Sequence, residues 1–130
     1  MIVLDASAAV DWLLQTSAGQ SIEKRIYSRN ETLHAPHLLD IEVTQVLRRL
    51  ALQRVVPVLR ADEAVRDLLD LRISRYPHVV LLPRIWQLRH NLSAYDAAYI
   101  VLAEKLGAAL VTRDRRLASA SGHAAAIELF

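Results

Sequence analysis

The sequence predicts an α/β fold in which helices cover both faces of a central, mostly parallel sheet, a three-layer α/β/α arrangement. Short apolar segments typical of buried strands alternate along the chain with longer segments whose apolar residues recur at helical spacing. The chain has 130 residues, which suits one domain over residues 1–130. It contains no cysteine, so we expect neither disulfides nor a cysteine-bound metal.

Strand and helix signals alternate through the first half of the chain. Residues 2–5 are apolar up to Asp5, as in a buried strand, and Ser7 is placed to cap the helix that follows. Further on, apolar residues recur at helical spacing until Pro57 breaks the pattern. The expected elements are a strand over residues 2–5, a helix from Ser7 to about Leu14, a helix over 19–29, a strand from Thr32 to Ala35, and a long helix from Pro36 to Arg54.

The second half continues this alternation. Val79 to Leu82 is a β-branched and apolar run between two prolines, which favours a strand, and Gly107 is placed to end a helix. The expected elements are a helix from Ala61 to Ser74, a strand from Val79 to Leu82, a helix over 84–91, a helix from Ser93 to Leu106, a strand from Ala108 to Thr112, a helical turn over 114–118, and a strand from Ala126 to Leu129.

Composition and apolar runs indicate where the protein is located and which kinds of partner it could bind. No apolar run approaches the roughly 18 residues that span a membrane, and the N-terminus does not resemble a signal peptide. We therefore expect a soluble, cytoplasmic protein. Hydrophobic residues make up 53%, which fits either a well-filled core or an apolar surface for a partner. Fourteen of the sixteen basic residues are arginines, which suits phosphate contacts but also follows from codon bias in a GC-rich genome.

Two aspartates follow strands that are far apart in the sequence. Asp5 ends the first expected strand, and Asp114 comes just after the strand that ends at Thr112. Ligands bind outside the carboxyl ends of parallel strands, so we expect both carboxylates at the same edge of the sheet. Each also has a purely structural interpretation, because Asp5 with Ser7 can cap the next helix and Asp114 can cap the turn 115–118.

Asp96 and Glu42 lie near the starts of two expected helices. Asp96 shares a helical face with Tyr99 and Ile100, so it belongs to a stripe that should be buried, where an unpaired carboxylate is costly. It also stands three residues after Ser93, which fits a capping box. Glu42 flanks the apolar stripe of its helix, where an ordinary boundary glutamate is the alternative interpretation.

Taken together, the four acidic residues point to a metal site. Carboxylates about 4 Å apart repel by roughly 4 kcal/mol per pair at an effective dielectric constant of about 20. A divalent cation removes this cost, and a donor set made only of oxygens favours Mg²⁺ or Mn²⁺ over zinc. The five histidines show no His-x-x-x-His spacing, so we expect no catalytic role for them.

The segments that contain these acids resemble the successive motifs of PIN domains. The segments are Asp5-Ala6-Ser7-Ala8 at the N-terminus, Glu42 in the long helix, Leu92-Ser93-Ala94-Tyr95-Asp96-Ala97, and Thr112-Arg113-Asp114. The likeness covers essentially the whole chain, in order and at suitable spacing, and residues 92–117 are especially similar to VapC toxins. Each motif is short, but the ordered set is specific.

The resemblance implies a PIN-like fold and a Mg²⁺- or Mn²⁺-dependent endoribonuclease with one or two ions per active site. The residues it implies are the catalytic and metal-binding acids Asp5, Glu42, Asp96 and Asp114, with the supporting hydroxyls of Ser7 and Thr112. It further implies a toxin that cleaves RNA, forms a homodimer, and is silenced by a VapB-type antitoxin in a heterotetramer or larger complex. Promoter DNA would be bound only through the antitoxin.

Five further residues are candidates for intermolecular contacts. Arg113, Arg115 and Arg116 flank the acidic edge, where they either contact RNA phosphates or form a solvated basic turn. Trp12 and Trp86 are either interface anchors or core residues.

Other functional classes fit less well. A receiver domain needs an acidic pair at the first strand and a lysine after a late one, but Asp5 has no acidic neighbour and neither Lys24 nor Lys105 follows such a strand. A phosphatase with an aspartyl nucleophile needs an acid at position 7, which is Ser7. A PIN-like module that only binds RNA or protein has no need for four repelling carboxylates, and a metal titration would separate it from an enzyme.

Overall fold

Five parallel strands form one sheet in the computed structural model, which describes residues 1–130. The strands are β1 (Ile2–Leu4), β2 (Leu33–Pro36), β3 (Ile73–Tyr76), β4 (Ala109–Thr112) and β5 (Ile127–Leu129), in the spatial order β3-β2-β1-β4-β5. The chain runs from β1 outward to β3 and then returns to β4 on the other side of β1. The strand order therefore reverses between β1 and β4, which is where open α/β sheets bind ligands.

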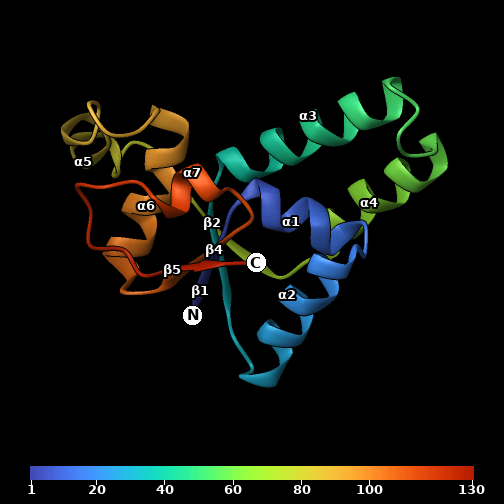
Figure 1. The fold of residues 1–130 in the computed structure, drawn as a ribbon, viewed down its shortest axis with the longest axis horizontal. Coiled ribbons are helices and arrows are strands. Elements are labelled where there is room, and N and C mark those ends of the chain that lie inside the picture. Colours follow the sequence, from blue (N-terminus) through green and yellow to red (C-terminus); the bar gives the residue numbers. More distant parts are fainter.

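Helices lie on both sides of this sheet. They are α1 (Ala6–Leu13), α2 (Ser17–Ser28), α3 (Leu38–Leu52), α4 (Val58–Asp70), α5 (Leu82–Gln87), α6 (Ala94–Leu106) and α7 (Arg115–Ala118). In Figure 1, α5 and α6 lie on one side of the sheet, α1 and α2 lie on the other, and α3 and α4 form an arm that extends away from it. The expected three-layer arrangement with a parallel sheet is confirmed.

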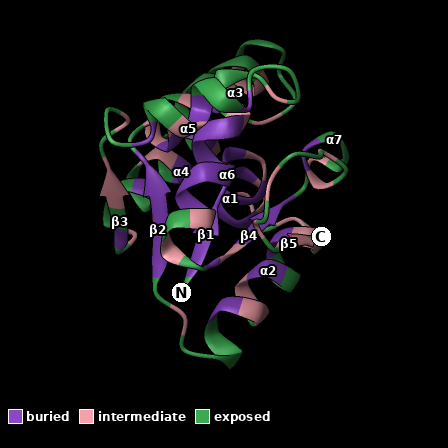
Figure 2. Ribbon diagram, turned by 90° about the vertical axis from the view of Figure 1, so that its left-hand side faces the viewer, coloured by how far each residue is buried: buried purple, intermediate pink, exposed green.

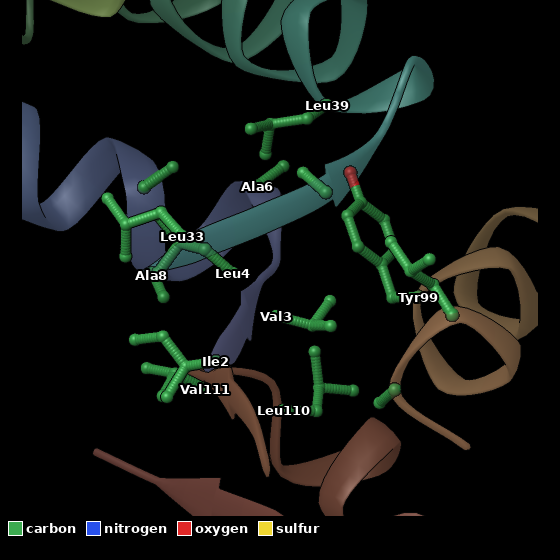
Figure 3. Close-up of a cluster of buried hydrophobic side chains, with 14 of the residues drawn as sticks. Ile2, Val3, Leu4, Ala6, Ala8, Leu33, Leu39, Tyr99, Leu110 and Val111 are labelled. Atoms are coloured by element: carbon green, nitrogen blue, oxygen red, sulfur yellow. The ribbon is translucent and has the colours of Figure 1, made fainter. Parts of the chain in front are cut away.

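The core is centred on β1 and its neighbours. All of β1 is buried, as expected for a parallel strand covered on both faces, and Figure 2 shows the central strands and the inner faces of the helices in the buried colour. Figure 3 shows Val3 beside Leu110 of β4, with the ring of Tyr99 packed next to them from α6. The residues that follow β1 and β4 are therefore anchored to a well-packed core.

Helix α6 has the boundaries that its sequence predicts. Ser93 is its N-cap, with the hydroxyl accepting a hydrogen bond from Asp96 N at 3.1 Å, and Gly107 ends it in the left-handed conformation at φ 59°. The seven residues from Ala97 to Ala103 are all buried, because α6 packs between α5 and the sheet. Asp96 thus lies on the first turn of a helix whose position is set by its packing against α5 and the sheet.

One expected strand is wrong. The segment from Val79 to Leu82 is not a strand. The third strand is β3, whose first two residues fall at the end of the expected helix from Ala61 to Ser74 and whose last two fall in no expected element. Helix α4 starts three residues earlier than expected and ends at Asp70, after which Leu71 takes an extended conformation.

Contacts across the sheet edge explain this difference. The Tyr76 hydroxyl is 2.8 Å from His34 Nδ1, and Arg75 forms a two-point ion pair with Asp40 on α3 at 2.7 and 2.9 Å. Ile73 is buried against β2, whereas the two valines of the misplaced strand are exposed. Partners distant in sequence outweigh the local β-propensity of the later segment.

Two smaller expectations are decided by burial and capping. The N-cap of α1 is Asp5 rather than Ser7, since Asp5 Oδ1 accepts a hydrogen bond from Ala8 N at 2.9 Å. Trp12 is a core residue, whereas Trp86 is 68% exposed and remains available for a contact. None of the helices combines the length and the apolar character that crossing a membrane requires.

Candidate active site

All four acidic residues that the sequence singles out line one cleft. Asp5 follows β1, Asp114 follows β4, Glu42 lies on α3, and Asp96 lies on the first turn of α6. They border a cavity of about 450 Å³ at the carboxyl edge of the sheet. The fold therefore brings together side chains from four distant segments, as the sequence predicts.

Asp5 is the deepest of the four acids and is 5% exposed. Its Oδ1 accepts hydrogen bonds from Ser7 Oγ at 2.7 Å and from Ala8 N, and its Oδ2 accepts one from Thr112 Oγ1 at 2.5 Å. Burial raises the pKa of Asp5 above its ordinary value, and the nearby Asp114 carboxylate adds to this rise, while the three hydrogen bonds oppose it. Asp5 is held in one orientation by donors on both of its oxygens.

The hydroxyls of Ser7 and Thr112 join the two strand ends. Thr112 Oγ1 donates to Asp5 and accepts from Asp114 N at 2.9 Å. Ser7 Oγ donates to Asp5 and accepts from Arg113 N at 2.9 Å. Both hydroxyls that the sequence predicts as supporting residues thus contact Asp5 and the backbone that leads to Asp114.

Asp96 and Asp114 combine capping with a place in the cleft. The cap at Ser93 is formed by the backbone N–H of Asp96, and the Asp96 carboxylate borders the cleft. Asp114 caps α7 through Oδ1, and its Oδ2 lies 3.6 Å from Arg116 Nη2. Burial raises the pKa of Asp96, and the Asp114 carboxylate raises it further, while the Ser93 hydroxyl and the charge of Arg116 oppose this rise. The structural and functional interpretations of these two acids are therefore compatible.

Glu42 is held by a tyrosine from the opposite wall of the cleft. The Tyr99 hydroxyl donates to Glu42 Oε2 at 2.6 Å, and Figure 3 shows this hydroxyl pointing towards the end of β2 and the start of α3. It is the one side-chain hydrogen bond between α3 and α6. Burial raises the pKa of Glu42, the Tyr99 hydrogen bond lowers it, and the charges of Asp96 and Asp5 raise it again.

Tyr99 and six other residues that line the cleft are not among the site residues that the sequence predicts. Ile41 and Gln45 line the cleft on either side of Glu42, and Tyr95 stands beside Asp96. A helical-spacing argument finds part of this set, because residues three and four apart share a face of α3 and of α6.

The three arginines near the acidic edge differ in their availability. Arg113 Nε donates to Asp11 Oδ2 at 2.7 Å, and its Nη1 donates to the carbonyl of Phe130, so its guanidinium is engaged within the protein. The Arg116 side chain is 92% exposed, and Arg115 is also exposed. Contacts between these arginines and RNA phosphates remain a prediction, for which Arg115 and Arg116 are the accessible candidates.

The donor set fits a hard, hydrated cation. All four side chains offer oxygens only, and three of them have raised pKa values to which neighbouring carboxylates contribute. No three Asp, Glu, His or Cys side chains are gathered tightly enough to hold a metal ion by themselves. Mg²⁺ suits such a cleft, because it usually keeps several waters and takes only one or two protein carboxylates.

Known proteins share both the sequence and the fold. The PIN domain model matches residues 2–122. The chain is 42% identical to Ribonuclease VapC12 of Mycobacterium tuberculosis over 99% of this chain and 98% of that protein. Its fold is similar to that of PAE2754 from Pyrobaculum aerophilum, with a TM-score of 0.69, 29% identity, and coverage of 97% of this chain and 81% of the other. It is also similar to VapBC2 from Rickettsia felis bound to a DNA fragment from their promoter, with a TM-score of 0.66, 13% identity, and coverage of 100% and 99%. The chain therefore belongs to the PIN domain family.

Proposed function

We propose that this chain is a Mg²⁺- or Mn²⁺-dependent endoribonuclease that acts as the toxin of a type II toxin–antitoxin pair. The observation that carries the proposal is the convergence of Asp5, Glu42, Asp96 and Asp114 on one cleft at the switch point of the sheet. The name of the relative Ribonuclease VapC12, which matches along nearly the whole chain, supports RNA as the substrate.

The residues of the cleft divide the work of phosphodiester hydrolysis. Asp5, Asp96 and Asp114 would hold one or two divalent ions, which would polarise the scissile phosphate and neutralise its charge. Glu42 has one oxygen bound to the Tyr99 hydroxyl. Its other oxygen is free and would bind an ion through a water molecule, or accept a proton from the attacking water and so orient it. In-line attack on phosphorus leaves a 5′-phosphate and a 3′-hydroxyl. Ser7 and Thr112 keep Asp5 aimed into the cleft through their hydrogen bonds.

Partners follow from the same family membership. We propose a homodimer in the cytoplasm, silenced by a VapB-type antitoxin in a heterotetramer or larger complex that reaches promoter DNA through the antitoxin. The solved structure of VapBC2 bound to a DNA fragment from their promoter supports the antitoxin partner and the contact with promoter DNA. Exposed apolar side chains on the arm of α3 and α4, such as Ile41, Leu52 and Leu59, provide surface for a protein partner.

Metal dependence and the chemistry of the cleaved ends test the proposed function. The purified protein, freed of any antitoxin, is incubated with total RNA in Mn²⁺, in Mg²⁺ or in EDTA, and the new ends are sequenced with and without prior removal of 5′-phosphates. We expect cleavage only with metal, and fragments that carry 5′-phosphates. Cleavage in EDTA would favour a metal-free nuclease. RNA binding without cleavage and without Mn²⁺ binding would favour the non-enzymatic module.

Tyr99→Phe is expected to weaken Mn²⁺ binding and cleavage about 10- to 100-fold, the usual cost of losing a partner that orients a metal ligand. The substitution removes only the hydroxyl that holds Glu42, and it keeps the buried ring. Calorimetric Mn²⁺ titration and cleavage at saturating Mn²⁺ measure the two effects. Tyr95→Phe is the matched control, because it removes an exposed hydroxyl four residues away on the same helix. Equal losses in the two variants would contradict a specific role for Tyr99.

A further inference from the structure

A second, smaller hollow adjoins the acidic cleft. It has a volume of about 190 Å³ and is called the side pocket here; its lining residues are Leu38, His78, Leu82, Ile85, Ala94, Tyr95 and Ala98. Leu38 and Tyr95 line both the side pocket and the acidic cleft, so the two hollows share a wall. No carboxylate lines the side pocket, and six of its seven residues are hydrophobic.

Tyr95 stands at the boundary between the two hollows. It directly precedes Asp96 on the first turn of α6, it is 64% exposed, and its hydroxyl forms no hydrogen bond within the protein. An exposed aromatic ring beside a phosphate-cleaving site is suited to stacking against a base of single-stranded RNA, an interaction worth about 1–3 kcal/mol per base.

His78 is the one lining residue of the side pocket that is not hydrophobic. Its Nε2 accepts a hydrogen bond from Leu38 N at 2.9 Å, so the neutral ring carries its proton on Nδ1. The Nδ1–H group forms no hydrogen bond within the protein. Stacking between aromatic and apolar side chains is the usual way in which a base is held outside a duplex.

We propose that the side pocket binds one nucleobase of single-stranded RNA next to the scissile phosphate, with the base stacked on Tyr95. This rests on the proposed ribonuclease function. A phosphate in the acidic cleft places the neighbouring base within one nucleotide of the shared wall at Leu38 and Tyr95. The base carries no charge, so the side pocket holds it without the repulsion that the four carboxylates exert on phosphates. Continuity with the cleft favours RNA over a protein partner, although Leu82 on the rim is itself exposed.

Fluorescence anisotropy with labelled RNA octamers tests the proposal. Eight-residue oligouridine and oligoadenine, and an abasic octamer with the same backbone, are titrated with the protein in Ca²⁺, and gels check that the RNA stays intact. We expect Tyr95→Ala to raise the Kd for both base-containing octamers about tenfold. Tyr95→Phe, which keeps the ring, should change Kd less than about twofold, and all variants should bind the abasic octamer equally weakly.

Trp86→Ala is the matched control, since Trp86 is an exposed aromatic residue on α5 that lines neither hollow. The proposal is overturned if Tyr95→Ala binds the base-containing octamers like the wild type, if Trp86→Ala weakens binding equally, or if the wild type binds no octamer. A change in oligomeric state by size-exclusion chromatography with unchanged RNA binding would make the side pocket a protein contact. The nuclease proposal is tested separately, by metal-dependent cleavage of total RNA by the wild type. Its failure is distinguishable from that of the side-pocket proposal, because Tyr95→Ala leaves the four acids in place.

Discussion

Asp96→Asn is expected to lower RNA cleavage by at least roughly 10²- to 10³-fold, the loss typical of removing one electrostatic group from a catalytic site. The Asp96 carboxylate borders the cleft near the Asp114 carboxylate, so its charge is available to a cation in the cleft. Asparagine keeps the size of the side chain and the backbone N–H that binds Ser93, so the N-terminal turn of α6 is preserved. Cleavage of total RNA in saturating Mn²⁺ measures the effect.

The same substitution should not lower stability in metal-free buffer. Burial, with the Asp114 carboxylate, raises the pKa of Asp96, which means that the folded protein disfavours the ionised form relative to the unfolded chain. In the wild type this cost is fully present above the raised pKa, and it is relieved as the pH falls through that pKa. Asparagine removes it at every pH, so the melting temperature without metal should stay equal or rise.

Metal is expected to reverse the order of the melting temperatures of the wild type and Asp96→Asn. Mn²⁺ binds the folded wild type and raises its melting temperature, whereas Asp96→Asn should show little of that rise. Thermal melts in EDTA and in Mn²⁺ give both comparisons. Asp62→Asn is the control, because Asp62 is an exposed aspartate on α4 outside the cleft. Full cleavage by Asp96→Asn, or an equal loss in Asp62→Asn, would refute the role assigned to Asp96.

The convergence of Asp5 and Asp114 could be predicted because it depends only on strand direction. Once two apolar segments are recognised as neighbouring parallel strands, the residues after them must emerge at the same edge. Asp96 and Glu42 could be placed on their helices by apolar periodicity, but their distance from the strand ends depends on how α3 and α6 sit on the sheet. The sequence therefore predicts which acids line the cleft, whereas the Tyr99–Glu42 hydrogen bond across the cleft can be recognised only in the structure.

The misplaced third strand shows where local patterns stop being informative. Val79 to Leu82 has the higher β-propensity, yet β3 forms from a segment with a serine and an arginine at its centre. Arg75 and Tyr76 there find Asp40 and His34, which lie 35 and 42 residues away in the sequence. No local window contains these partners, so a rule based on propensity assigns the strand to the wrong side of Pro77.

Gly19→Ala is expected to lower the free energy of unfolding by about 3 kcal/mol or more, at the upper end of overpacking costs. Gly19 is buried on α2, and a Cβ there would lie 1.9 Å from the carbonyl oxygen of Asp11 and 2.9 Å from Trp12 Cα. Both clashes are with the backbone of α1, so no side-chain rotation relieves them. The two helices would have to separate, which breaks the close packing on which their pairing depends.

Urea unfolding of Gly19→Ala beside Gly107→Ala separates packing from backbone conformation. Gly107 has φ 59° and open space around its Cβ position, so alanine there costs only the left-handed conformation, about 1 kcal/mol. Equal losses in the two variants would contradict the close approach of α1 and α2. A larger loss at Gly19 should also reduce cleavage. The new Cβ displaces Asp11, whose carboxylate binds the side chain of Arg113, the residue between Thr112 and Asp114 in the sequence. The spacing of α1 and α2 at Gly19, which does not line the cleft, thereby affects the acidic edge.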